Sequence, residues 1–218
     1  LGNLDGGSQQ SLAVVSTIAQ DYSLGALAAV SLHDLSLRDT LSPTSGDAVV
    51  AVSGDRVMVL NRLNTDTIQV YTESLTNPVL DLALEDLSNP HDAEICGNQL
   101  WISLHNTAYL PVYSLENALL AGNVDLSEWA GADNSAEASS LIVRNQNLFV
   151  AVQQFKQDDG WSSDGGVILQ IDCQSRSIKE EISLGPSPTI EAGPEPEVIG
   201  FKTGLYGVMD GRIGLLDI

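Results

Sequence analysis

The stretch that decides the fold is AEICGNQLWISL at residues 93–104, in which two apolar runs flank the dipeptide Gly97-Asn98. Glycine at the first position of a two-residue turn suits the positive φ of a type II′ hairpin, whose twist matches that of the flanking strands. The stretch therefore predicts two antiparallel strands. The same pattern recurs in VAVSGDRVMVL (residues 50–60), LIVRNQNLFVAV (141–152) and VIGFKTGLYGVM (198–209).

Each of these hairpins is followed by a third apolar run, and an additional copy of that run, ALAAVSL, lies at residues 26–32. Between equivalent residues the repeat is 40, 42, 57 and 46 residues long, from Val30 to Val70, Val112, Leu169 and Leu215 in turn. A period in the forties with about four short strands per unit is typical of a β-propeller. We therefore predict an all-β protein, a β-propeller of four-stranded antiparallel blades with almost no helix.

The strand count predicts about five blades, of which the first lacks its inner strand and the last lacks its outer strand. Exposed strand edges pair readily with another chain. This favours a larger ring of the seven-bladed type; the alternatives are a ring completed by a second chain, and a closed five-bladed ring in which residues 1–8 supply a strand. The predicted domains are a flexible lead-in at 1–10 and a propeller at 11–218, with blades near 11–43, 47–87, 91–129, 137–185 and 195–218.

Composition restricts the partners. Nine Lys and Arg against 29 Asp and Glu give a formal net charge of −20. Such a chain repels the phosphates of nucleic acids and anionic membrane surfaces, so nucleic acid is not expected as a partner. No apolar run approaches 18 residues, which predicts no membrane span. The acidity fits an exported or salt-tolerant protein that stays soluble through its charge.

Cys96 and Cys173 are the two cysteines of the chain. Each lies beside a predicted hairpin turn, the first near the propeller axis and the second near the rim. We expect two separate, half-buried thiols, with a disulfide as the alternative. Two cysteines do not define the redox compartment.

The repeat pattern also carries a family resemblance, most clearly in SNPHDAEICGNQLWISLHNTAYLPVYSLEN (residues 88–117) and SGDAVVAVSGDRVMVLNRLNTDTIQVYT (45–72). These segments resemble bacterial exported β-propeller proteins of the YVTN-repeat type. The resemblance implies a surface lipoprotein or periplasmic protein without assigned activity. It predicts an extracellular, cell-surface or periplasmic location.

Acidic residues recur at or before the start of each predicted inner strand. Because inner strands begin at one rim of the central channel, these side chains are expected to converge on one mouth. A ring of carboxylate oxygens suits Ca²⁺, which takes six to eight oxygen ligands; the alternative is that they are solvated loop acids. The residues are Asp47, Asp92, Glu137, Glu195 and Glu197.

His91 and His105 form a second candidate site. Pairing Cys96 with Gln99 across the turn puts both histidines at the same end of one hairpin, with side chains starting on opposite faces. A copper or zinc site needs its ligands on one side and a further partner, for which Asp92 and Asn106 are candidates. The alternative is a pair of ordinary hydrogen-bonded histidines.

The longest repeat contains QQFKQDDGWSSDGG at residues 153–166, an insertion relative to the other repeats. Long loops often carry function. The insertion contains Asp158, Asp159, Ser162 and Asp164 together with three glycines, a spacing that could wrap Ca²⁺, although it is not the EF-hand pattern. A partner-binding loop and a merely flexible insert are the alternatives.

Motif searches exclude several activities: CxxCH, GxSxG, P-loop, HExxH and dinucleotide fingerprints are absent, so neither haem attachment nor nucleotide binding is predicted. The sequence favours a non-enzymatic, exported binding or assembly module that binds Ca²⁺, with a protein partner or second chain completing the propeller. One alternative is a metal-dependent hydrolase or lactonase with Asp92, Glu137 and Glu197 around a channel cation. The other is a surface copper-binding protein that uses His91 and His105.

Overall fold

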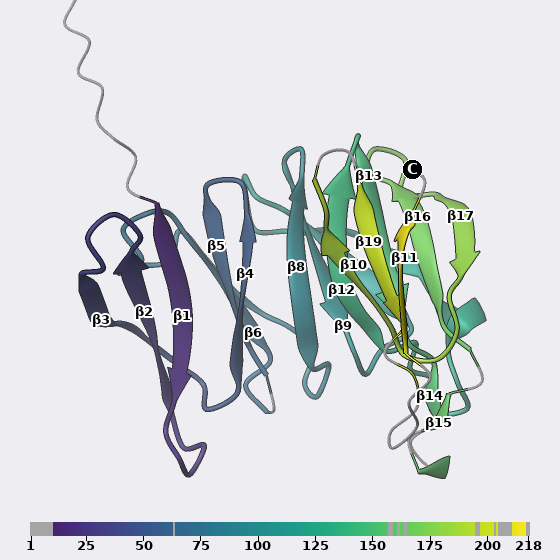
Figure 1. The fold of residues 1–218 in the computed structure, drawn as a ribbon, viewed down its shortest axis with the longest axis horizontal. Coiled ribbons are helices and arrows are strands. Elements are labelled where there is room, and N and C mark those ends of the chain that lie inside the picture. The colour runs from purple at the N-terminus through teal and green to yellow at the C-terminus, as the bar shows by residue number, and fades with distance from the viewer. Residues whose placement is uncertain are drawn as a thin grey trace, which may run out of the picture.

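The computed structural model describes residues 11–62, 64–156, 159–160, 162–163, 165–194, 197–202, 204 and 211–216. Within these residues the chain forms β-strands joined by turns, with a 3-10 turn, η1 (Ser127–Trp129), after β11 (Leu120–Asp125). The strands form five successive antiparallel sheets and one short hairpin (Figure 1). The predicted all-β architecture of four-stranded blades is confirmed.

The second, third and fourth sheets each have four strands, paired in the order in which they occur along the chain. The second sheet contains β4 (Ala48–Ser53), β5 (Arg56–Asn61), β6 (Thr67–Tyr71) and β7 (Leu80–Ala83). The third contains β8 (Pro90–Cys96), β9 (Gln99–Leu104), β10 (Tyr109–Ser114) and β11 (Leu120–Asp125). The fourth contains β12 (Ala138–Arg144), β13 (Asn147–Val152), β16 (Val167–Asp172) and β17 (Ile178–Ser183).

The two end sheets have three described strands each. The first sheet contains β1 (Leu12–Ile18), β2 (Gly25–Ser31) and β3 (Leu37–Thr44). The fifth contains β18 (Pro188–Ala192), β19 (Val198–Lys202) and β20 (Arg212–Leu216). The insertion adds a hairpin that the sequence did not predict, β14 (Phe155–Lys156) with β15 (Ser162–Ser163).

The hairpin turns behave as their glycines predict. Gly54 and Gly97 have φ values of +60° and +63°, at the first turn position between β4 and β5 and between β8 and β9. The strands then pair in register, with Val52 opposite Val57 in the second sheet. The turn chemistry therefore sets which side chains face each neighbouring sheet.

The inner strands lie side by side around the axis: β1 beside β4, β4 beside β8, β8 beside β12, and β12 beside β18 (Figure 1). This corrects the prediction for the first set of strands. Because β1 packs beside β4, it is the inner strand, and the described part of the first sheet lacks an outer strand. The fifth sheet starts at Pro188, earlier than the predicted blade near 195–218, and most of the second half of the hairpin predicted at 198–209 lies outside the described residues.

Apolar side chains that alternate along the strands pack at each interface between successive sheets. In the third sheet, Trp101 packs toward the fourth sheet, while Leu100 and Ile102 pack toward the second. All three side chains are fully buried. Period-two alternation thus lets one strand supply two cores, which explains why the inner runs are continuously apolar.

The third and fourth sheets are also joined covalently, by a disulfide between Cys96 and Cys173 whose Cα atoms are 6.2 Å apart. The prediction of two separate thiols is wrong. It placed each cysteine within its own blade, whereas the residue ending β8 reaches across the interface to the residue following β16. Nearby, the Arg176 guanidinium donates to the carbonyl oxygen of Ala121 (2.7 Å), a second link between the same two sheets.

Candidate functional site

The open ends of the first hairpins in the second, third and fourth sheets gather polar residues around the axis. In each sheet the residue after the second strand donates its backbone N–H to a residue just before or at the inner strand, so these positions are equivalent. The bonds run from Arg62 to Asp47 (3.2 Å), from His105 to Asn89 (3.0 Å) and from Gln153 to Glu137 (3.2 Å).

His91 and His105 are brought together here. Their rings are stacked, with centroids 4.5 Å apart and an interplanar angle of 25°. The predicted opposite faces are wrong because the pairing of β8 with β9 shifts between Pro90 and Asp92, leaving His91 in a β-bulge. A bulge re-aims the extra residue, and here it turns His91 onto His105.

Burial keeps the histidine pair neutral. It lowers the pKa of His91 to about 3, with the neighbouring His105 and Arg62 adding to the effect. Burial also lowers the pKa of His105, against hydrogen bonds to Asn106 and Gln153 that favour its charged form. Neutral imidazoles are metal ligands in principle. In stacked imidazole rings, however, the nitrogen lone pairs lie in the two ring planes and do not converge on one metal ion between the rings.

Asp47 does not point into a shared carboxylate ring. It forms an ion pair with Arg62, with Oδ1 2.7 Å from the guanidinium Nη2. Both side chains are about three-quarters buried, at 25% and 22% exposure. The pair contributes to one wall of a polar cavity between the first and second sheets. Asp47 is therefore neutralised by the chain itself.

Glu137 is the most perturbed acid of the predicted set. Its side chain is fully buried, and Oε2 accepts a hydrogen bond from the backbone N–H of Phe155 (3.0 Å). Oε1 is buried without a hydrogen-bond partner among the described residues. Burial, followed by the charge of Asp133, raises the pKa of Glu137 to about 8. The carboxyl is therefore protonated at neutral pH.

Asp92 faces a different space, a cavity of about 210 Å³ between the inner strands β4, β8, β12 and β18. Its two oxygens accept backbone N–H groups of Ala93 (2.8 Å) and Leu141 (2.7 Å). Burial raises its pKa to about 7 despite these bonds, and the charges of Glu94 and Glu191 add to the rise. Asp92 thus bridges the third and fourth sheets at the axis.

The remaining predicted ligands are only partly described. Asp159 accepts a hydrogen bond from the Ser162 hydroxyl (2.9 Å), but Asp158, Asp164 and Glu195 lie outside the described residues. Glu197 precedes β19, where its backbone N–H donates to the carbonyl of Pro194 (2.7 Å). The calcium loop at 153–166 therefore stays a prediction.

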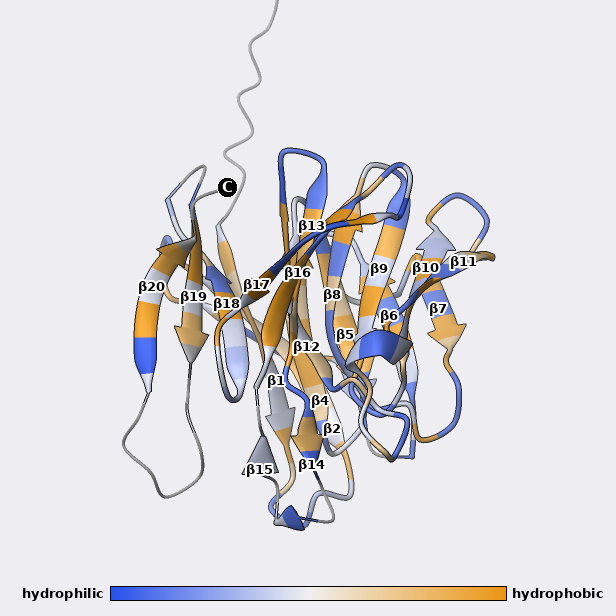
Figure 2. Ribbon diagram, turned by 90° about the vertical axis from the view of Figure 1, so that its right-hand side faces the viewer, coloured by the Kyte–Doolittle hydropathy of each residue, from blue (hydrophilic) through white to orange (hydrophobic). Residues whose placement is uncertain are grey.

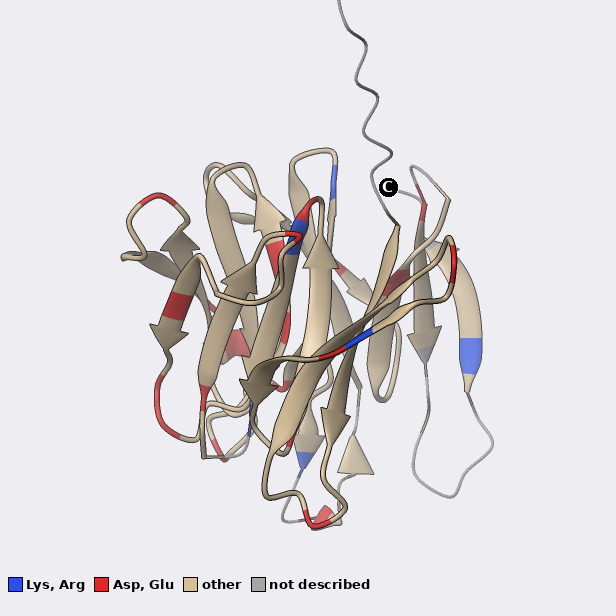
Figure 3. Ribbon diagram, turned by 90° about the vertical axis from the view of Figure 1, so that its left-hand side faces the viewer, with Lys and Arg blue, Asp and Glu red and all other residues tan. Residues whose placement is uncertain are grey.

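Within the described part of the chain, no three His, Cys, Asp or Glu side chains are grouped closely enough to hold a metal ion. Asp92 faces the inter-strand cavity, whereas Glu137 is bonded to β14. Among described residues the predicted carboxylates are distributed over separate environments. Figure 3 shows the same dispersal for the described residues, with acidic residues on several strands and loops.

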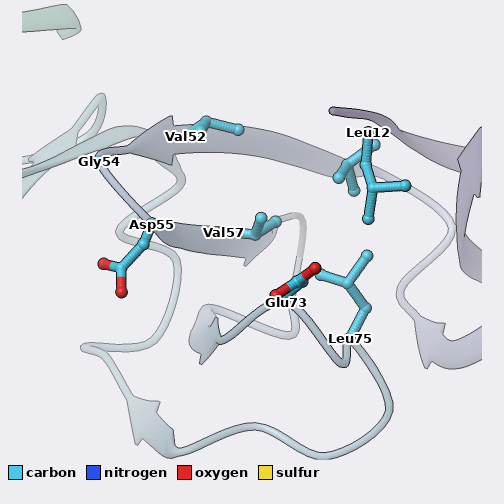
Figure 4. Close-up of a pocket in the computed structure, with 8 residues that line it drawn as sticks. Leu12, Val52, Gly54, Asp55, Val57, Glu73 and Leu75 are labelled. Carbon is cyan, nitrogen blue, oxygen red and sulfur yellow. The ribbon is translucent and has the colours of Figure 1, made fainter. Parts of the chain in front are cut away.

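Sequence reasoning missed an apolar cavity of about 200 Å³ between the first and second sheets (Figure 4). Leu12 and Val14 of β1 face Val57 of β5, and Leu75, which follows β6 and is 1% exposed, forms the inner wall. The carboxylate of Glu73 lies beside these side chains in Figure 4. Only the sheet packing brings these residues together, so no local motif signals the cavity.

No protein-family model and no curated protein sequence match the chain. The resemblance to YVTN-repeat proteins therefore stays a prediction. Among solved structures, hydrazine synthase of Kuenenia stuttgartiensis matches with a TM-score of 0.63 and 11% identity over 92% of this chain. A streptogramin B lyase matches with a TM-score of 0.60 and 12% identity over 95% of this chain.

A third match is a putative 6-phosphogluconolactonase from Bacteroides uniformis, with a TM-score of 0.56 and 10% identity over 81% of this chain. At such identities the likeness concerns the fold alone, and it supports the β-propeller architecture. The chain spans 59% of the hydrazine synthase chain, 57% of the putative lactonase and 73% of the lyase. In the described part of the chain, no helix is long and apolar enough to span a bilayer.

Proposed function

We propose that the chain is a non-enzymatic binding or assembly module, a sector of a propeller ring whose two end sheets are covered by further antiparallel blades. The observation that carries this proposal is the one-sided burial of the end sheets. In the first sheet, Leu27 and Ala29 face the second sheet and are fully buried. On the opposite face, Val15 and Leu37 are 44% and 62% exposed.

The fifth sheet repeats this asymmetry. Ile190 and Val198 pack into the core shared with the fourth sheet, at 1% and 0% exposure. Ile213 and Leu215, on the other face, are 69% and 63% exposed, and Figure 2 shows β20 at the edge of the molecule. In soluble proteins, a large exposed apolar patch usually marks a site of interaction. Blades of the same kind would cover both faces by the packing already used four times within the chain.

Native mass spectrometry and sedimentation of the purified 23.1 kDa chain test this proposal, because they measure its association state. Uncovered end faces are expected to drive self-association of the isolated chain, and Val15→Lys and Ile213→Lys are expected to reduce it. Val79→Lys, at a residue that is 59% exposed just before β7, serves as the control and should leave the mass distribution unchanged. A chain that stays monomeric at high concentration, with or without the substitutions, contradicts the proposal.

We also propose export to an oxidising compartment. The Cys96–Cys173 disulfide supports this, because such bonds persist mainly outside the reducing cytosol. Thiol labelling of protein taken from its native cells without reductant tests it, since free cysteines in that material would contradict export.

Calcium binding by the loop at 153–166 completes the proposal, supported by the spacing of its three aspartates. Calorimetric titration with Ca²⁺ is expected to show binding that Asp159→Asn weakens. Absence of heat in the wild-type chain contradicts it.

A further inference from the structure

One structural position recurs in three sheets, one or two residues after the end of the third strand. In the third sheet it is Leu115, whose backbone N–H donates to the carbonyl of Asn98 in the first hairpin turn (3.1 Å). In the fourth sheet it is Cys173, whose N–H donates to Gln146 in the equivalent turn (3.0 Å). Both residues therefore lie opposite the second residue of a hairpin turn.

The register of β5 with β6 identifies the same position in the second sheet. Val57 pairs with Tyr71. Continued for two residues beyond Tyr71, where β6 ends, this register places Glu73 at the position opposite Asp55, the second residue of the turn between β4 and β5. Glu73 occupies the place of Leu115 and Cys173.

The three residues differ in what they do at the interface with the preceding sheet. Leu115 packs against the apolar cluster between the second and third sheets. Cys173 is bonded to Cys96 between the third and fourth. Glu73 is charged and exposed, and the equivalent place between the first and second sheets is the apolar cavity of about 200 Å³. Leu115 and Cys173 each fill the space at their own interface, whereas the space beside Glu73 stays open.

We propose that this cavity receives a lysine side chain of a partner protein, with the methylene stem against Leu12, Val57 and Leu75 and the ammonium on Glu73. Lysine stems bury along apolar surface while the charged end stays near water, which matches apolar walls with a carboxylate at the rim. Lysine carries a compact ammonium on a flexible four-carbon stem, so its stem can follow the apolar walls while its charge reaches the carboxylate at the rim.

Charge complementarity supports this occupant. The residues lining the cavity include Asp55 and Glu73 but no lysine or arginine. Asp55 is already paired with Arg56, at 3.5 Å. The formal charge of −20 attracts cationic groups to the surface in general, and the cavity gives one of them a shaped site. The proposal deepens the assembly function above by naming the chemistry of the contact.

Methyl NMR of leucine- and valine-labelled protein tests the site with Nα-acetyl-lysine methylamide as the probe. The methyl signals of Leu12 and Leu75 are expected to shift with the probe. Nα-acetyl-norleucine methylamide, which has the apolar stem without the ammonium, should bind more weakly. Glu73→Gln should weaken the lysine probe about fivefold, the upper range for an exposed ion pair, and remove the preference over norleucine.

Glu116→Gln is the matched control, since Glu116 is an exposed glutamate in the turn after β10, and it should leave binding unchanged. Absence of methyl shifts overturns the proposal, as do equal shifts with both probes in the wild-type chain. The outcome is separable from that of the proposed assembly function. Val15→Lys and Ile213→Lys test the end faces by the mass of the assembly, whereas Glu73→Gln tests the cavity by ligand preference.

Discussion

Replacing Glu137 by glutamine should stabilise the protein at neutral pH, and the gain should disappear in acid. Glu137 is fully buried, and its pKa is raised from 4.5 to about 8. The folded protein therefore holds a proton that the unfolded chain releases above pH 4.5. Stability contributed by this group is fully present below pH 4.5 and is lost as the pH rises toward 8.

The size of the effect follows from the pKa difference. Each unit is worth about 1.4 kcal/mol, so keeping Glu137 protonated at pH 7 costs about 3 kcal/mol relative to a side chain that is always neutral. Glutamine is such a side chain, and its amide oxygen can accept the Phe155 N–H as Oε2 does now. Glu137→Gln is therefore expected to raise the free energy of unfolding by about 3 kcal/mol at pH 7, and to leave it nearly unchanged at pH 4.

Urea unfolding of both proteins between pH 4 and pH 8 measures this. Because the other titrating groups are common to both chains, the difference between the two pH profiles isolates Glu137. Glu116→Gln, at an exposed position, should follow the wild-type profile. Parallel profiles for Glu137→Gln and the wild type would refute the assignment of a buried, protonated carboxyl.

Three further outcomes are expected. Gly46→Ala should lower the free energy of unfolding by about 2 kcal/mol in urea titrations, because its β-carbon would collide with the Tyr22 carbonyl oxygen. Cys96→Ser should cost about 4 kcal/mol by the same measurement, since the disulfide closes a loop with a sequence separation of 77; an unchanged midpoint would mean that the bond adds nothing. In NMR pH titrations the ring of His91, whose pKa is lowered to about 3, should stay neutral down to about pH 4, and a transition above pH 5 would contradict its burial.

The fold could be predicted because its signals are local. Gly54 and Gly97 each supply the positive φ of a tight turn, and the alternating runs beside them fix which faces are buried. Because this hairpin pattern recurs along the chain, it predicts a series of similar blades and hence a propeller. The same local logic could not reveal which strand of the first sheet is innermost, because that depends on β1 packing beside β4, a contact between separate sheets.

The site residues show where sequence reasoning fails. Ideal pairing put His91 and His105 on opposite faces, but one bulged residue in β8 reverses the direction of His91. The equivalent sequence positions of Asp47 and Glu137 also predicted that their carboxylates converge. In the structure Asp47 forms an ion pair with Arg62, and Glu137 accepts a hydrogen bond from the backbone N–H of Phe155. A bulge or a single neighbouring donor changes the environment of a side chain without changing the repeat that suggested its role.

One position of the repeat serves a different purpose at each of three interfaces, where it is occupied by Glu73, Leu115 and Cys173. At Leu115 and Cys173 the backbone N–H is bonded to the hairpin turn opposite it, so the side chain can vary without loss of that hydrogen bond. An apolar residue closes the interface, a cysteine locks it covalently, and a carboxylate opens it to a ligand. If Glu73→Leu closes the cavity as Leu115 closes its own interface, it should both stabilise the chain and abolish binding of the lysine probe. Stability and recognition would then be alternative uses of one position in the repeat.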